Sequence, residues 1–121
     1  MLPTNVDESF VCCLSSLNLL HFNEWESTDA VETMIFFLDT VISEFITKSR
    51  GLPFMKRAHT FAKRHRALGL GVLGWHSFLQ SQMIPFEGLQ AQMLNNIVFK
   101  SISNKAKEAS KDLANRFGTP A

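Results

Sequence analysis

The stretch from Glu8 to Leu20 constrains the fold of this chain more than any other. It reads E-S-F-V-C-C-L-S-S-L-N-L-L and contains no Gly, no Pro and, after Glu8, no charged residue. A continuous run of this kind fits a β-strand buried on both faces, and we expect such a strand to begin at about Phe10. The run also fits the first turns of a buried helix, because periodicity alone does not separate the two.

The composition is that of a globular protein without a strong electrostatic partner. The chain has 121 residues, 45% hydrophobic and 19% charged, with a net charge of +1, which suits one domain. Its N-terminus lacks a basic start followed by an apolar segment, so we expect no secretory signal. The best candidate for a membrane span, Met34 to Ile46, is interrupted by Asp39 and Glu44. We therefore expect a soluble, cytoplasmic protein with no membrane partner.

Cys12 and Cys13 are the only cysteines of the chain. A disulfide between neighbouring residues closes a strained ring, so we expect both thiols to be reduced, as in the cytosol. A buried thiol usually packs as a small hydrophobic group, and a redox role is the alternative. On a strand the two side chains point to opposite faces, so at most one of them faces any active site.

Most of the remaining chain is predicted to be helical. Asp29 and Glu32 resemble a capping box at the start of a helix that Gly51 and Pro53 end. Further helices are expected over 54–65 and, before Gly118 and Pro120, over 87–117. The apolar residues at helical spacing in the first helix are Val31, Met34, Ile35, Leu38, Val41, Ile42 and Phe45, and those in the last are Leu89, Met93, Leu94, Ile97, Ile102, Ala106, Ala109 and Leu113.

Gly69, Gly71 and Gly74 match the G-x-G-x-x-G pattern of dinucleotide-binding loops. That pattern requires a preceding strand and an acidic residue about 20 residues later. The preceding residues F-A-K-R-H-R-A-L do not read as a strand, and the next acid, Glu87, lies beyond the break at Pro85. We expect these glycines to serve close helix packing and not phosphate binding.

The other polar clusters are expected to be solvated surface. The basic run from Lys56 to Arg66 contains no acid, and we expect a helix face in water and not a nucleic-acid site. His59 and His65 do not share a helical face, so no metal site is expected. The carboxylates of the first helix are predicted to serve solubility and not acid–base catalysis; they are Asp29, Glu32, Asp39 and Glu44.

A single strand among helices is not expected to form a stable domain by itself. A lone strand leaves its backbone N–H and C=O groups unpaired, which is costly when they are buried. The sequence therefore predicts a piece of a larger α/β protein, or a chain that associates through its strand. The alternative is a self-contained helical protein-interaction module whose cysteines are core residues.

Two motifs resemble one known family when they are taken together. They are C-C-L-S-S-L-N-L at Cys12 to Leu19 and K-R-H-R-A-L-G-L-G-V-L-G-W at Lys63 to Trp75, and a long helix separates them. Their order and spacing are similar to the large (alpha) subunit of class I ribonucleotide reductase, and the similarity extends over essentially the whole chain. Leu2-Pro3-Thr4 also suits the segment that follows the active-site loop of that family.

The resemblance implies a mostly helical segment, with one or two strands, of an α/β barrel of the ten-stranded kind. It implies reduction of ribonucleoside diphosphates to deoxyribonucleoside diphosphates, in which a thiyl radical abstracts a hydrogen and a cysteine pair supplies the electrons. Cys12 would be one member of that pair, with its partner cysteine outside this chain. Cys13 would be the outward or core residue, and Leu14 would line the substrate pocket.

The chain also departs from that family's pattern. The Asn-x-Cys-x-Glu loop with the radical cysteine, the partner of Cys12, the radical-transfer tyrosines and the C-terminal shuttle cysteines do not occur in the sequence. We therefore expect residues 1–121 to be one internal segment of the catalytic barrel. No cofactor is expected in this chain: a small subunit would supply the radical and its metal, and a thioredoxin- or glutaredoxin-type protein the reducing equivalents. The other expected partners are the remaining segments of the large subunit and the nucleotide substrate.

Overall fold

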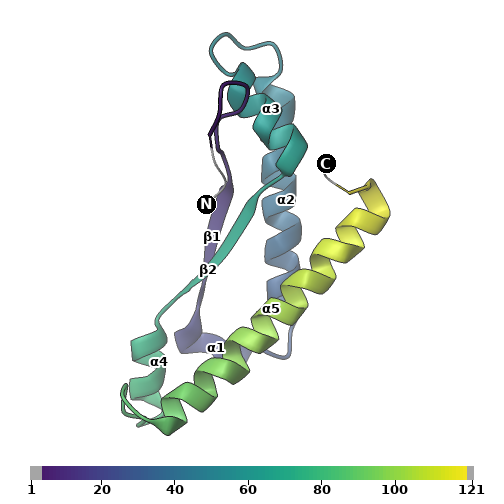
Figure 1. Ribbon diagram of the computed structural model, residues 1–121. Helices are drawn as coiled ribbons and strands as arrows, with labels where there is room; N and C mark the ends of the chain where they lie inside the picture. Colours follow the sequence, from purple (N-terminus) through teal and green to yellow (C-terminus); the bar gives the residue numbers. More distant parts are fainter. Residues whose placement is uncertain (1–3, 120–121) are drawn as a thin grey trace.

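A computed structural model describes residues 4–119 of the chain (Figure 1). Leu2 and Pro3, which resemble the segment after the family's active-site loop, and Pro120, expected just after the last helix, lie outside the described residues. The elements in order are strand β1 (Cys13–Asn18), 3-10 helix η1 (Leu19–His21), α1 (Phe22–Trp25), α2 (Ala30–Ser49), α3 (Lys56–His65), β2 (Leu68–Leu73), α4 (Trp75–Ser81) and α5 (Leu89–Phe117).

β1 and β2 form a two-stranded parallel sheet, with Cys13 opposite Leu68 and Asn18 opposite Leu73. Parallel strands need a long crossover, which α2 and α3 provide here. The prediction that the glycine segment packs helices is wrong, because 68–73 is a strand. The reason is local: Arg66 ends α3 in the left-handed conformation (φ 45°), which frees the chain to extend at once.

Within residues 4–119, helices cover one face of this strand pair and leave the other uncovered. α2 packs against both strands (Figure 1), and Leu17, Leu70 and Val72 belong to the hydrophobic core on that side. On the other face, Leu14 is 73% exposed and Leu73 is 52% exposed. The expectation of a strand buried on both faces is therefore wrong for the described residues, and β1 begins at Cys13 and not at about Phe10.

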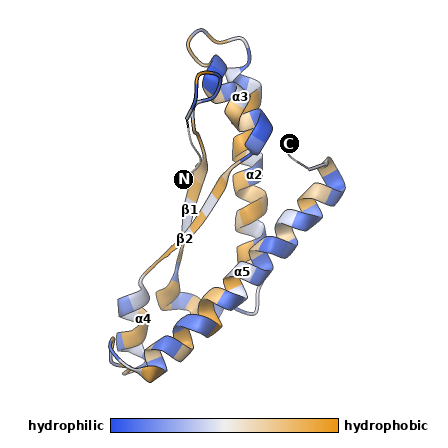
Figure 2. Cartoon of the chain, viewed as in Figure 1, coloured by the Kyte–Doolittle hydropathy of each residue, from blue (hydrophilic) through white to orange (hydrophobic). Residues whose placement is uncertain are grey.

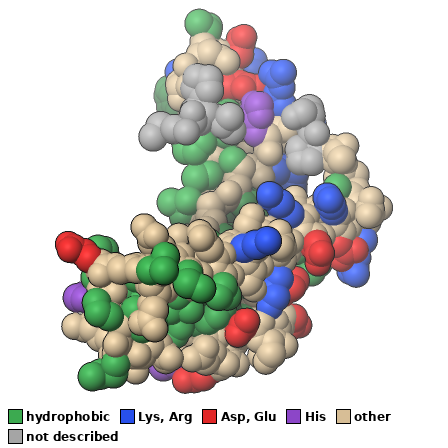
Figure 3. All heavy atoms as spheres, turned by 60° about the horizontal axis from the view of Figure 1, so that its bottom comes forward, with side chains coloured by type: hydrophobic (Ala, Val, Ile, Leu, Met, Phe, Trp, Pro, Cys, Tyr) green, Lys and Arg blue, Asp and Glu red, His purple; other side chains and the backbone are tan. Residues whose placement is uncertain are grey.

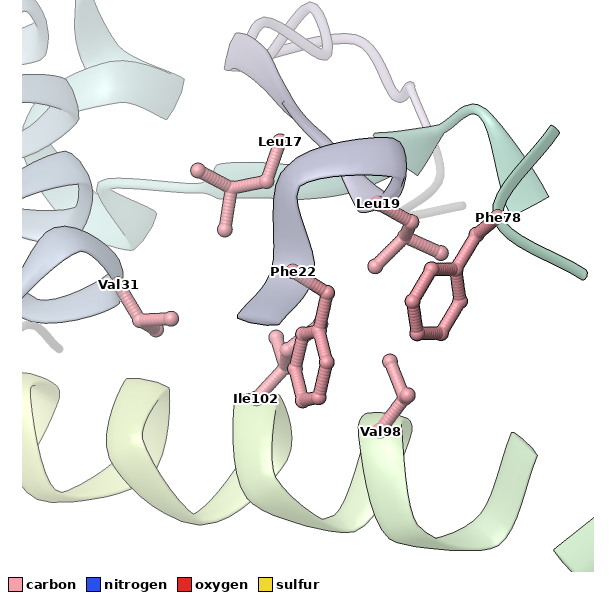
Figure 4. Close-up of a cluster of buried hydrophobic side chains, with 7 residues drawn as sticks. All are labelled: Leu17, Leu19, Phe22, Val31, Phe78, Val98 and Ile102. Carbon is pink, nitrogen blue, oxygen red and sulfur yellow. The ribbon is translucent and has the colours of Figure 1, made fainter. Parts of the chain in front are cut away.

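The main core lies where β1 turns into η1 and α1 (Figure 4). Trp25 is held there, because its indole N–H donates a hydrogen bond to the carbonyl oxygen of Asn18 at 3.0 Å. Phe22 stacks edge-on against both Trp25 and Phe78. The buried side chains of this cluster come from six elements of the chain; they are Leu17, Leu19, Phe22, Val31, Phe78, Val98 and Ile102.

The start of α2 differs from the predicted capping box. Asp29 is the N-cap residue but makes no side-chain capping bond. The hydroxyl of Thr28 instead accepts a hydrogen bond from the N–H of Ala30 at 3.3 Å, while one carboxylate oxygen of Glu32 is buried without a partner among the described residues. The predicted end of the helix is confirmed, since Gly51 follows Ser49 with a φ of 74°.

The predicted final helix is confirmed as α5, and its apolar stripe is confirmed at Leu94, which packs against the main core, and from Ile102 onward. Ile102 and Ala109 are buried, as expected. Met93 and Ile97, at 56% and 57% exposure, face outward near the start of the helix, where Ala91 and Val98 are buried instead. Hydrophobic and hydrophilic residues alternate along α5 (Figure 2), and hydrophobic side chains gather on the surface at the end of the molecule where it starts (Figure 3).

Replacing Phe78 by Ala should lower the free energy of unfolding by about 3–5 kcal/mol, because the ring is buried at the junction of β1, α4 and α5. The matched control is Phe54→Ala, since the Phe54 side chain is fully exposed and its removal should change stability by less than about 0.5 kcal/mol. Urea titration followed by circular dichroism would measure both. Equal midpoints for the two variants would contradict the described core.

Candidate active site

Cys12 lies immediately before β1, on the side of the strand pair that no helix covers. Val11 and Cys13, its two neighbours, both pack against the small cluster of Ile42, Ile46 and Ala62. In an extended chain alternate side chains point to opposite sides, so the Cys12 thiol points away from that cluster. By this alternation Cys12 lies on the side of Leu14 and Cys13 on the side of α2, and both thiols are free and partly buried.

Cys13 is the packing thiol of the pair. Burial raises the pKa of the Cys13 thiol above its usual value, and the neighbouring Cys12 adds to the shift. A raised pKa lowers the fraction of thiolate, which is the reactive form. The environment of Cys13 therefore suits a core residue.

Few side chains project from the uncovered face of the sheet, because β2 contributes two glycines to it. Leu14 lies opposite Gly69, and Ser16 lies opposite Gly71. A Cβ atom on Gly69 would come within 2.4 Å of Leu14 Cδ2, so Leu14 leans over the bare backbone of β2. The face beside Cys12 thus carries Leu14, the Ser16 hydroxyl and the bare backbone of two glycines, with Leu73 at its far end.

The last glycine of the G-x-G-x-x-G segment serves a turn. Gly74 has a φ of 78° at the N-terminus of α4, and a Cβ there would lie 2.5 Å from the side-chain oxygen of Asn18. That conformation and that contact both favour glycine. The segment is therefore a strand and a turn packed against β1, as the pairing of β2 with β1 requires.

Glu8 is a buried carboxylate that the sequence analysis did not single out. Its side chain is 7% exposed, and its two oxygens lie 3.1 Å from Arg64 Nη1 and 3.1 Å from His65 Nε2. A carboxylate only accepts hydrogen bonds, so the Nε2 atom of His65 carries the proton that it donates. The hydrogen bond from His65 is the largest influence on the pKa of Glu8 and, with Arg64, holds it below its usual value against the opposing effect of burial.

Arg66 joins the end of α3 to α2. Its guanidinium contacts Asp39 Oδ1 at 2.8 Å and 3.1 Å and the Asp39 carbonyl oxygen at 3.1 Å, and it also donates to the Ser43 hydroxyl. The assignment of Asp39 as a solubility residue is therefore wrong, because its carboxylate is 20% exposed and paired. Three residues at the end of the basic run thus contact acids from other segments of the chain.

The remaining polar candidates do not come together. Ser49 Oγ and His59 Nδ1 are 2.9 Å apart, but Ser49 is buried at the end of α2, and neither residue lies near Cys12 in the sequence or belongs to its strand pair. Within residues 4–119, no three His, Cys, Asp or Glu side chains form a group able to hold a metal ion. No helix in the same range is long and apolar enough to cross a membrane.

The comparisons with known proteins agree on one family. A family model described as "Ribonucleotide reductase, barrel domain" matches residues 1–121, the whole chain. The chain belongs to the ribonucleotide reductase barrel-domain family. It is 60% identical to the alpha subunit of the Actinobacillus ureae class Id ribonucleotide reductase, whose solved structure matches with a TM-score of 0.96 over 99% of this chain and 23% of that one.

The ribonucleotide reductase relatives are all much longer than this chain. A ribonucleoside-diphosphate reductase large subunit of Frog virus 3 is 41% identical over 97% of this chain and 21% of its own length. The large subunit of Invertebrate iridescent virus 6 is 39% identical over 99% of this chain and 12% of its own length. The chain therefore spans less than a quarter of each of these two relatives, and the predicted family and barrel-segment fold are confirmed.

Replacing Gly69 by Ala should destabilise the chain through its contact with Leu14. The added Cβ would meet Leu14 Cδ2 at 2.4 Å, so Leu14 must move. A double-mutant cycle with Leu14→Ala should give a coupling of about 0.5–3 kcal/mol in unfolding free energy. Gly88→Ala is the control, because a Cβ at Gly88 meets no atom within 4 Å. Additive effects of the two changes would contradict the described register.

Cys12 should react with iodoacetamide faster than Cys13 in the folded chain. Burial raises the pKa of the Cys13 thiol, so less of it is thiolate near neutral pH, and it packs against Ile42 and Ile46. Peptide mass spectrometry at successive times would give both rates. The difference should vanish in urea, and equal rates under native conditions would show that the two thiols are not separated as described.

Proposed function

We propose that this chain works as a segment of a ribonucleotide reductase large subunit, which reduces ribonucleoside diphosphates to deoxyribonucleoside diphosphates for DNA synthesis. The observation that carries the proposal is the free thiol of Cys12 beside the uncovered face of the strand pair, in a chain of the barrel-domain family. Residues 1–121 would be one piece of the catalytic barrel domain, and Cys12 would be a redox-active cysteine.

The chemistry requires two thiols for each substrate. Two electrons and two protons leave a pair of cysteines, the 2′-hydroxyl of the ribose departs as water, and a disulfide remains. Cys12 would supply one of the two sulfur atoms, and the other would come from a cysteine outside this chain. A thiol–disulfide exchange protein of the thioredoxin or glutaredoxin type would then restore both thiols.

The uncovered face of the strand pair would form part of the substrate pocket. Leu14 would contact the nucleotide, because it lies on the same side as Cys12 and is 73% exposed in this chain. The bare backbone of Gly71 beside Ser16 leaves room for close approach of a ligand. Cys13, on the opposite side, would pack the strand against α2.

The proposed partners follow from the family. They are the remaining segments of the large subunit, a small subunit that generates the radical with its metal, and the nucleotide substrate. The uncovered edges of β1 and β2 fit the first of these, because each strand has one hydrogen-bonded neighbour within the described residues. The free thiols suit a reducing compartment, and we propose the cytoplasm.

A self-contained helical interaction module is the less favoured alternative. A module of that kind would not need a parallel strand pair with open edges and one uncovered face. It would unfold as a monomer in one cooperative transition and bind little hydrophobic dye, whereas a barrel segment with an uncovered sheet face should bind hydrophobic dyes in its folded state.

Complementation tests the proposal. This chain would be expressed with segments that supply the rest of a large subunit, combined with a small subunit and dithiothreitol, and assayed for reduction of a ribonucleoside diphosphate. We expect turnover with Cys12 present and loss of at least about 100-fold with Cys12→Ser, since an alcohol cannot form the disulfide. Cys13→Ser is the matched control and should retain most of the activity.

Two outcomes of the same assay would contradict the proposed role of Cys12. The 121-residue chain by itself should give no deoxynucleotide, because its sequence does not contain the Asn-x-Cys-x-Glu loop with the cysteine that would abstract the hydrogen. Turnover by the isolated chain, or an assembled subunit that is active without Cys12, would contradict the proposed role.

A further inference from the structure

The segment that leads into Cys12 is docked on α3 by several contacts. The Ser9 N–H donates to the carbonyl oxygen of Arg57 at 3.2 Å, and the ring of Phe10 stacks edge-on against Phe61 with centroids 5.3 Å apart. After Cys12, the N–H of Cys13 donates to the carbonyl oxygen of Ala67 at 3.3 Å. The position of Cys12 is therefore set from both sides by α3 and the turn that follows it.

Glu8 is the charged member of this docked segment. It is 5% exposed, whereas Asp7, the acid next to it, is exposed and makes no side-chain bond or ion pair among residues 4–119. The Glu8 carboxylate accepts one hydrogen bond from Arg64 and one from His65, both at the last turn of α3. A buried carboxylate is retained only when such partners compensate the loss of water.

The end of α3, which binds Glu8 through Arg64 and His65, is also bonded to α2, the helix that packs against both strands. Arg66, the next residue after His65, is fixed to Asp39 of α2 by bonds of 2.8 Å and 3.1 Å. His65 also stacks on Phe61 at 4.5 Å between ring centroids, which limits rotation of the imidazole. A continuous set of contacts thus runs from α2, through the end of α3, to the segment before Cys12.

We propose that Glu8 is a positioning residue for Cys12, which acts through the ion pair with Arg64 and the hydrogen bond with His65. This inference rests on the proposed redox role of Cys12. The carboxylate holds the docked segment against α3, and the fixed chain length between Glu8 and Cys12 then determines where the thiol projects beside the uncovered face. Arg64 and His65 are positioning residues by the same argument, and none of the three touches the reacting atoms.

Thiol labelling of the full 121-residue chain tests the placement directly. Glu8→Gln retains the shape of the side chain but loses its charge and one acceptor, so the amide presents a donor to a donor. We expect the ratio of Cys12 to Cys13 alkylation rates with iodoacetamide to rise by roughly threefold or more, because the docked segment opens locally. Asp7→Asn is the matched control, since it removes one negative charge from the neighbouring exposed residue, and should leave the ratio unchanged.

A second variant guards against loss of folding. His65→Phe removes the Nε2 donor to Glu8, keeps an aromatic ring against Phe61 and leaves Arg64, so the ratio should rise by a smaller factor than in Glu8→Gln. An unchanged ratio in both variants would overturn the proposal. So would an equal rise of both thiol rates in both variants, because Glu8 would then contribute only to global stability.

The assembled reductase provides the functional measurement. There Glu8→Gln should lower kcat by about 10- to 100-fold with little change in KM, because a misplaced thiol slows electron delivery without weakening substrate binding. Wild-type turnover that depends on Cys12 but is indifferent to Glu8→Gln would overturn the positioning role alone. An assembly in which Cys12→Ser is active would overturn the proposed function, and the labelling ratio would still decide whether Glu8 places the thiol.

Discussion

The parallel pairing of β1 with β2 is the constraint on which the rest of the structure depends. It joins segments separated by the whole α2–α3 crossover, and it brings Cys13 opposite Leu68 and Leu14 opposite Gly69. The crossover places its helices on one face of the pair, which gives Cys13 a core and leaves Cys12 and Leu14 on the other face. An isolated pair of strands has little stability of its own, so α2 and the core around Leu19 must hold it in place.

The helices could be predicted from the sequence because their signals are local. Apolar spacing and the stop at Gly51 gave α2 nearly to its ends, and the break before Glu87 gave the start of α5. The second strand could not be recognised, since Gly69 and Gly71 carry no side chains whose alternation would show a period of two. Their role depends on Leu14 in the partner strand, a contact that the register of the sheet decides.

Only part of the candidate site could be predicted from the sequence. Cys12 was found because its motif resembles a family and because adjacent thiols on an extended chain must separate. Glu8 and Asp39 were missed, although each holds cations at the end of α3. Neither acid has a local signature, since its partners come from distant parts of the sequence. The one available signal was a basic run that contains no acid of its own, which requires counter-charges from elsewhere when it is partly buried.

If Cys12 delivers electrons to the substrate, the oxidation state of its sulfur after one turnover records that step. An assembled subunit would be fully reduced, freed of dithiothreitol and mixed with a ribonucleoside diphosphate in the absence of an external reductant, and its cysteine peptides would be mapped by mass spectrometry. We expect the Cys12 peptide to be joined by a disulfide to a peptide outside this chain, in proportion to the deoxynucleotide formed, while Cys13 stays a thiol. Deoxynucleotide formed with Cys12 still a free thiol would contradict the redox role of Cys12.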